Sequence, residues 1–124
     1  MAVKVAINGF GRIGRLVLRA MVESGRGDLE CALINDLGSV EANAHLFRYD
    51  SVHGRFPGTV ETTADSMTIR HGGRAWGPIR VTAIRDPGAL PLTGVDVALE
   101  CTGLFTSKEK ALPLLAAGAR KVLV

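Results

Sequence analysis

A glycine-rich turn directly after the first apolar run constrains the fold of this chain more than any other feature. Residues 3–8 (VKVAIN) are largely apolar and partly β-branched, as expected of a parallel strand that is covered on both faces. Residues 9–14 (GFGRIG) have the spacing G-x-G-x-x-G and open a segment with helical periodicity. A strand, this turn and a helix in that order predict a dinucleotide-binding α/β fold.

Each glycine of the turn has its own expected role. Gly9 allows the tight turn, Gly11 lets the backbone approach a pyrophosphate, and Gly14 lets the helix pack close to the sheet. The phosphates would lie at the helix N-terminus, where free N–H groups and the helix dipole favour negative charge. The alternative is a turn that serves packing only. The predicted cofactor-binding residues are Gly9, Phe10, Gly11, Arg12, Ile13 and Gly14, with the backbone N–H groups of Arg12 and Ile13 on the pyrophosphate.

An acidic residue after the second predicted strand, residues 30–35 (ECALIN), indicates which dinucleotide binds. Asp36 follows Gly14 by about 20 residues, the spacing of an acid that binds the adenine ribose hydroxyls. A 2′-phosphate beside this carboxylate would cost about 4 kcal/mol per pair of unit charges at 4 Å and an effective dielectric of 20. The neighbouring Leu37 offers no compensating cation. NAD is therefore predicted in preference to NADP, the alternative being that Asp36 is only a turn or helix-capping residue.

The rest of the chain predicts further strands and helices around this unit. A helix is expected over residues 11–24, and another from an N-cap at Ser39 to about Tyr49. Residues 50–58 read as a loop, and the alternating runs of residues 59–84 indicate an antiparallel insertion. A buried strand over residues 96–101, a helix opened by a capping box at Thr106 and containing Pro113, and a strand from Lys121 follow. The apolar stripe of the first helix is expected to comprise Ile13, Leu16, Val17, Ala20 and Met21, with Arg12, Arg15 and Arg19 away from it.

These elements predict an α/β fold, a Rossmann-type parallel sheet with a small antiparallel insertion. The last residues, 121–124 (KVLV), read as a buried strand without a following turn. We therefore expect residues 1–124 to be an NAD-binding domain that is incomplete at its C-terminus, in a chain that lacks its catalytic domain.

Composition excludes several other classes of protein. The net charge is +3, but the basic residues form no block, which argues against a nucleic-acid partner. No run of about 20 apolar residues could span a membrane, and no signal peptide precedes the turn. Cys31 and Cys101 lie in apolar runs, as reduced thiols of a cytoplasmic protein do. No metal site is expected, because His45, His53 and His71 have no metal-ligand spacing with the cysteines and are expected on a helix surface, in a loop and in a hairpin.

Several segments together resemble the glyceraldehyde-3-phosphate dehydrogenase family. They lie in order along essentially the whole chain: Val5–Arg15, Ile34–Asp36, Tyr49–Phe56, Arg85–Pro87 and Glu100–Phe105. The resemblance implies a cytoplasmic, homotetrameric glycolytic oxidoreductase that uses NAD and inorganic phosphate to convert a phosphorylated aldehyde substrate to an acyl phosphate. It also implies that Arg85 lies near the adenine, and that Thr102 and Gly103 lie near the nicotinamide half.

The resemblance places no catalytic residue in this chain. The family's catalytic cysteine lies in a Ser-Cys-Thr-Thr-Asn-Cys segment beyond residue 124, and its histidine base lies further on. Cys101 occupies a position where relatives often carry serine, so it is not assigned as the nucleophile. The 124 residues alone are thus expected to bind NAD without turnover. The alternatives are an erythrose-4-phosphate dehydrogenase, whose relatives tend to carry glutamate at the position of Asp36, and a stand-alone, non-catalytic dinucleotide-binding module.

Overall fold

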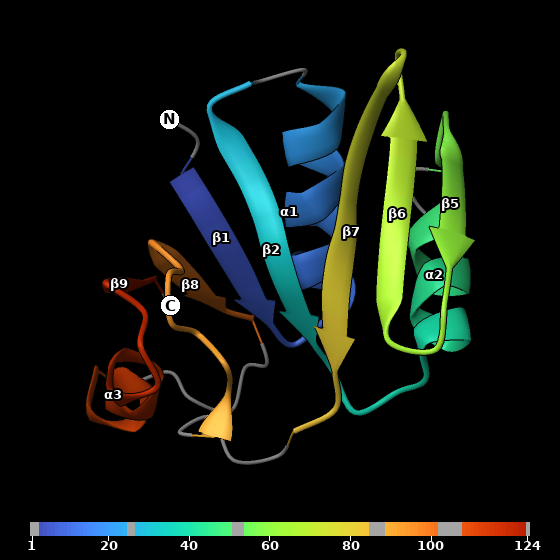
Figure 1. Ribbon diagram of the computed structural model, residues 1–124. Helices are drawn as coiled ribbons and strands as arrows, with labels where there is room; N and C mark the ends of the chain where they lie inside the picture. The colour runs from blue at the N-terminus through green and yellow to red at the C-terminus, as the bar shows by residue number, and fades with distance from the viewer. Residues whose placement is uncertain (1–2, 25–26, 51–53, 85–88, 102–107, 124) are drawn as a thin grey trace.

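A seven-stranded sheet, in the order β5-β6-β7-β2-β1-β8-β9, forms the centre of the molecule (Figure 1). The computed structural model describes residues 3–24, 27–50, 54–84, 89–101 and 108–123. The strands are β1 (Val3–Asn8), β2 (Leu29–Asn35), β3 (Tyr49–Asp50), β4 (Gly54–Arg55), β5 (Thr59–Thr62), β6 (Ser66–His71), β7 (Arg74–Thr82), β8 (Val97–Glu100) and β9 (Lys121–Leu123). The helices are α1 (Arg12–Glu23), α2 (Val40–Arg48) and α3 (Lys108–Ala116).

The sheet has a parallel part and an antiparallel part. β1 pairs in parallel with β2 and β8, β8 with β9, and β2 with β7. β5, β6 and β7 form an antiparallel meander, so β7 joins the two parts; in Figure 1 the arrow of β6 runs against those of β1, β2 and β7. The predicted fold class, a Rossmann-type parallel sheet with an antiparallel insertion, is confirmed.

Two apolar clusters lie on opposite faces of the sheet. The larger one packs α1 and α2 against residues such as Val5, Ile7 and Ile34. The smaller one contains Ala6, Leu33 and Ala98 on the strands, together with Leu114 of α3. Neighbouring residues of a strand point to opposite faces, so each central strand contributes to both clusters. This burial on both faces explains why the strands read as nearly continuous apolar runs.

The predicted apolar stripe of α1 was partly wrong. Met21 is buried and Val17 packs against the larger cluster, as predicted, but other members of the stripe are not buried. Ile13 is 66% exposed and Ala20 is exposed, whereas Leu18 and Val22 are buried. The helix carries apolar residues on more than one side, so periodicity alone did not fix its rotation. The close approach of Gly14 to the glycine-rich turn does fix the rotation of α1. Leu18 and Val22 lie one and two helical turns after Gly14 and therefore face the sheet as well.

Arg19, predicted to lie away from the apolar stripe, is buried at 5% exposure. Its Nε and Nη2 atoms donate to the carbonyl of Phe47 at 3.0 and 2.8 Å, and Nη2 also donates to that of Arg48 at 3.0 Å. These carbonyls belong to the last turn of α2, where no further helical N–H is available to them. Arg19 therefore caps the C-terminus of α2 with a positive charge, which the helix dipole favours.

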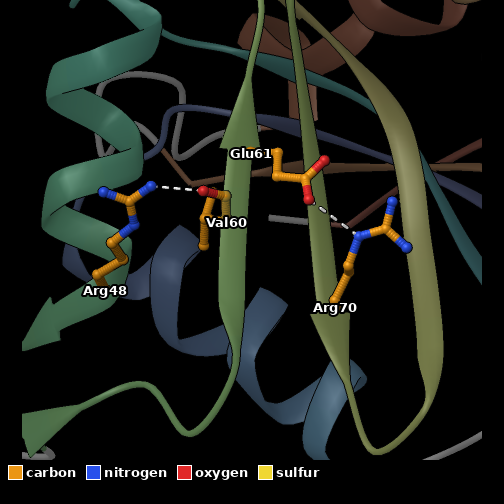
Figure 2. Close-up of polar contacts among 4 residues, drawn as sticks. All are labelled: Arg48, Val60, Glu61 and Arg70. Atoms are coloured by element: carbon orange, nitrogen blue, oxygen red, sulfur yellow. Dashed lines mark hydrogen bonds and ion pairs between the residues drawn. The ribbon is translucent and has the colours of Figure 1, made fainter.

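The start of α2 agrees with the sequence. The Ser39 hydroxyl accepts a hydrogen bond from the Ala42 amide at 3.1 Å, which confirms the predicted N-cap. α2 ends at Arg48, and the predicted loop that follows contains the short strand β4. Figure 2 shows Arg48 donating to the carbonyl of Val60 on β5, which joins α2 to the meander. The same view shows an exposed ion pair within the meander, Arg70 with Glu61 at 3.2 Å.

Candidate functional site

The candidate site lies where β1, β2 and β8 end. The chain leaves β1 and returns as β2 on one side, whereas β8 is added on the other side of β1. This reversal is the topological switch point at which open α/β sheets bind ligands, next to the carboxyl ends of their strands. The glycine-rich turn follows β1 at this point, and Asp36 follows β2.

The three glycines of the turn differ in their surroundings. Gly9 has a φ of +94°, a conformation that favours glycine. A Cβ atom on Gly14 would lie 2.3 Å from the Gly9 carbonyl oxygen, so α1 packs against the turn as closely as the backbone permits. A Cβ atom on Gly11 would meet nothing within 4 Å. The space that a side chain on Gly11 would enter is therefore free of described protein atoms.

The N-terminus of α1 borders this open space. The amide of Arg15 donates to the carbonyl of Gly11 at 2.9 Å, so the amides of Arg12, Ile13 and Gly14 precede the helical hydrogen bonds. The N-cap residue has no side-chain capping bond, and the first turn contains no acidic residue. The positive end of the helix dipole is thus not offset by the helix itself, which suits an anion.

Phe10 fixes the shape of the turn. Its ring is buried at 1% exposure and stacks against Phe47, with ring centres 6.1 Å apart. Its amide donates to Asp36 Oδ1 at 3.0 Å, and its carbonyl accepts from Arg15 Nη1 at 3.1 Å. Only the backbone of Phe10 therefore faces the turn, and its polar groups already have protein partners.

Asp36 lies directly beside the turn, as its sequence spacing predicts. Besides Phe10, its carboxylate accepts from the Gly38 amide, at 3.0 Å to Oδ2. An ionised carboxylate accepts about four hydrogen bonds, so two bonds leave capacity for a vicinal pair of hydroxyl groups. Leu37 is 57% exposed and brings no charge. The bond between Asp36 and Phe10 was not anticipated from the sequence, because it joins residues 26 positions apart.

Three buried polar residues at the same edge of the sheet were not predicted from the sequence. Asn8, Asn35 and Glu100 are the last residues of β1, β2 and β8 and are only 4–6% exposed. Asn8 Nδ2 donates to Glu100 Oε2, and Asn35 Nδ2 donates to Asn8 Oδ1, both at 2.8 Å. The available signal was a polar residue at the end of each of three apolar runs.

The two cysteines are not activated thiols. Burial, and then the charge of Glu100, raise the pKa of the half-buried Cys101 above its ordinary value. Burial raises the pKa of Cys31 to about 12. Both side chains are therefore protonated at neutral pH, and a protonated thiol is a poor nucleophile.

Several predicted positions are not near the site or lie outside the described residues. His45 is exposed on α2, and His71 ends β6, where its Nδ1 is 2.9 Å from the carbonyl oxygen of Pro57. No three metal-binding side chains come together among the residues with described positions. Within the described part of the chain, no helix is both long and apolar enough to cross a membrane. Arg85, Thr102, Gly103, His53 and the capping box at Thr106 lie outside the described residues.

Comparison with known proteins gives one consistent result. Residues 3–108 match the family model described as glyceraldehyde 3-phosphate dehydrogenase, NAD binding domain. The whole chain is 65% identical to a glyceraldehyde-3-phosphate dehydrogenase of Xanthobacter flavus, 63% to one of Cereibacter sphaeroides and 56% to one of Pseudomonas aeruginosa. The chain spans 36% of the length of each of these relatives.

Proposed function

Because the chain belongs to the glyceraldehyde-3-phosphate dehydrogenase family and matches its NAD-binding domain, we propose that its parent protein oxidises glyceraldehyde 3-phosphate with NAD. The product is an acyl phosphate formed with inorganic phosphate, as in the phosphorylating members of the family. Residues 1–124 form an NAD-binding domain, and the nucleophile, the base and the substrate-binding residues belong to the remaining part of the protein. NAD supplies the hydride acceptor.

Two observations carry the proposal: the space that a Cβ on Gly11 would enter is open, and Asp36 is hydrogen-bonded to the amide of Phe10 in the same turn. Arg12 and Ile13 donate their backbone N–H groups to the pyrophosphate, which the uncompensated helix dipole attracts. Asp36 accepts hydrogen bonds from the two adenine ribose hydroxyls and repels a 2′-phosphate. By resemblance to the family, Arg85 lies near the adenine, and Thr102 and Gly103 bind the nicotinamide half.

Substrate and assembly follow from the family. An aspartate rather than a glutamate after β2 supports the triose phosphate over the tetrose phosphate, and the relatives named above are all glyceraldehyde-3-phosphate dehydrogenases. The parent protein is proposed to be a cytoplasmic homotetramer. Sequencing the gene beyond codon 124 tests this reading directly, because a segment containing the family's catalytic cysteine must follow. A stop codon at that point would instead support a stand-alone binding module.

Titration with NAD and NADP tests the assigned roles. Wild-type protein is expected to bind NAD in preference to NADP, and Asp36→Ala is expected to lose that preference together with the acceptor for the Phe10 amide. Asp36→Asn removes the charge but keeps one acceptor oxygen, so it should retain more affinity for NAD than Asp36→Ala while still discriminating less against NADP. An unchanged ratio of the two dissociation constants in both variants would remove Asp36 from this role.

The isolated chain of 124 residues provides a second test. It is expected to bind NAD weakly and to show no dehydrogenase turnover, because Cys101 is a protonated thiol and no other nucleophile is assigned to it. Robust activity of this chain with glyceraldehyde 3-phosphate would refute the proposal that the catalytic nucleophile belongs to the remaining part of the protein.

A further inference from the structure

A row of four polar side chains crosses the central strands at their carboxyl ends. Thr82 of β7 lies opposite Asn35 of β2, Asn35 lies opposite Asn8 of β1, and Asn8 lies opposite Glu100 of β8. Residues that are paired in register point to the same face of a sheet. The four side chains therefore form one continuous line across β7, β2, β1 and β8.

Hydrogen bonds join all four members of this row. Thr82 Oγ1 donates to Asn35 Oδ1 at 2.6 Å, Asn35 Nδ2 donates to Asn8 Oδ1 at 2.8 Å, and Asn8 Nδ2 donates to Glu100 Oε2 at 2.8 Å. The side chains of Asn8, Asn35 and Glu100 are nearly inaccessible to water. Since one member is a carboxylate, the last bond is of the stronger, charge-assisted kind.

Asn35, at the middle of the row, uses its full hydrogen-bonding capacity. Besides the bonds within the row, its Oδ1 accepts from the Ile84 amide at 2.8 Å, and its Nδ2 donates to the Ile84 carbonyl at 2.9 Å. The amide oxygen thus accepts two bonds and the amide nitrogen donates two. This set of partners holds Asn35 in one orientation and joins the chain that follows β7 to the row.

The backbone of the row holds the first residue of each loop at the candidate site. The amide of Gly9 donates to the carbonyl of Asn35 at 2.7 Å, and the amide of Asp36 donates to that of Thr82 at 2.9 Å. The amide of Cys101 donates in the same way to the carbonyl of Asn8, at 2.8 Å. These main-chain bonds connect the first residue of each loop to the strand ends that the side chains of the row join.

Stability alone is a weak reason for a buried polar row. Two residues earlier on the same strands and the same face, the corresponding line is apolar: Ala98, Ala6 and Leu33. Apolar residues in place of buried polar or charged ones are often neutral or stabilising, and the backbone ladders already set the register of the strands. What a fully satisfied polar network adds is a single, rigid arrangement. The hydrogen-bonded row lies at the edge where the loops of the site begin.

We propose that Thr82, Asn35, Asn8 and Glu100 are positioning residues for the dinucleotide. The row fixes the carboxyl ends of β7, β2, β1 and β8 relative to one another, so that the pyrophosphate-binding turn and Asp36 meet the two ends of one adenosine diphosphate moiety. This inference rests on the proposed function, because it assigns a positioning role around the same NAD site. None of the four side chains is required to touch the cofactor.

The test compares variants that break the row with variants that keep it, in the complete gene product. Glu100→Leu removes the acceptor of Asn8, whereas Glu100→Gln retains an acceptor oxygen at the same place. Thr82→Val removes the hydroxyl that donates to Asn35 with little change of shape. Thr68→Val is the matched control, because Thr68 is also half-buried but lies on β6 in the meander. NAD and NADP dissociation constants and urea unfolding are measured for each protein.

Breaking the row is expected to weaken NAD binding and to reduce discrimination against NADP. Glu100→Leu should raise the dissociation constant for NAD about tenfold and Thr82→Val about threefold, as expected when a buried group loses its partner. Both should lower the ratio of the NADP to the NAD dissociation constant, because Asp36 is displaced from the ribose. Glu100→Gln and Thr68→Val should remain close to wild type in both quantities. A residue that acts only on folding would change urea unfolding and leave that ratio unchanged.

The outcomes separate this inference from the proposed function. If wild-type protein binds NAD and folded Glu100→Leu and Thr82→Val bind it equally well with an unchanged ratio, the row has no positioning role and the proposed function stands. If Glu100→Leu does not fold, the comparison of Thr82→Val with Thr68→Val in NAD affinity and in the NADP to NAD ratio decides whether the row has a positioning role. If wild-type protein does not bind NAD, both the proposed function and the inference are wrong.

Discussion

Gly11 and Gly14 are three residues apart, yet alanine at these two positions is expected to have different effects. At Gly14 an added Cβ would lie 2.3 Å from the Gly9 carbonyl oxygen and 3.2 Å from Ile7 Cγ2. Cβ atoms essentially never approach other atoms closer than 3.0 Å, so α1 or the turn must shift by about 0.7 Å. At Gly11 the added methyl group would meet no atom within 4 Å.

The free energies follow from these contacts. Overpacking in a close-packed interior costs about 1–3 kcal/mol, and the main atom that Gly14→Ala meets is a backbone oxygen that is not free to rotate away. Alanine also improves helix propensity by about 1 kcal/mol over glycine. Because the backbone contact puts Gly14→Ala at the upper end of the overpacking range, about 3 kcal/mol, the net loss in the free energy of unfolding is expected to be about 2 kcal/mol. This corresponds to roughly 8 °C in Tm for a cooperative unit of this size. Gly11→Ala, at the N-cap, should cost below about 1 kcal/mol.

For NAD binding the larger effect is expected at Gly11, the position where alanine affects stability less. Gly11→Ala is expected to fold like wild type and to raise the dissociation constant for NAD at least about tenfold, because the methyl group occupies the space through which the pyrophosphate approaches the backbone. Urea denaturation followed by circular dichroism measures the free energy of unfolding, and isothermal titration measures the dissociation constant for NAD. Wild-type stability of Gly14→Ala would refute the close packing of α1 on the turn. Wild-type NAD affinity of Gly11→Ala would refute the assigned position of the pyrophosphate.

Two further predictions concern groups outside the cofactor site. Arg19→Met removes two guanidinium hydrogen bonds to the carbonyl of Phe47 and one to that of Arg48, which keeps the Phe56 amide as a donor. It should lower the free energy of unfolding by about 2 kcal/mol, measured by urea denaturation, while NAD affinity stays unchanged. Cys31 has a folded-state pKa of about 12 against an ordinary value of 9.0, so between pH 9 and 12 the unfolded chain loses a proton that the folded protein keeps. The stability conferred by the neutral thiol is complete below pH 9 and falls with rising pH by about 1.4 kcal/mol per pH unit. Between pH 8 and 10.5 the free energy of unfolding should fall more steeply for wild-type protein than for Cys31→Val, which keeps only the contribution of Cys101, and parallel pH profiles would contradict the prediction.

The sequence predicted the parts of the fold that depend on short-range patterns. The first strand, the turn, the Ser39 cap and the antiparallel insertion each have a local signature, and the structure contains all of them. The rotation of α1 was predicted wrongly because Leu18 and Val22 compete with Ile13 and Leu16 for the apolar face. Only the contact of Gly14 with the turn selects between these two faces.

The polar row was beyond the reach of sequence patterns for a different reason. Asn8 and Glu100 are 92 positions apart, and their contact depends on β8 being placed beside β1 rather than beside β2. No local pattern determines the order of strands in a parallel sheet. A terminal Asn or Glu in an apolar run is, taken alone, equally consistent with the start of a solvated loop.

The hydrogen bond between Asp36 and Phe10 explains physically why the acid after β2 and the glycine-rich turn belong together. The turn holds Phe10 by its buried ring and its carbonyl, and without Asp36 the amide of Phe10 would have no acceptor among the described residues. One oxygen of the carboxylate therefore holds the turn at Phe10, while the carboxylate retains lone pairs for the proposed ribose contact. A neutral residue at this position would affect the shape of the pyrophosphate site as well as the choice between NAD and NADP. The two signals thus describe one structural unit, in which the group proposed to select the sugar also supports the turn proposed to bind the phosphates.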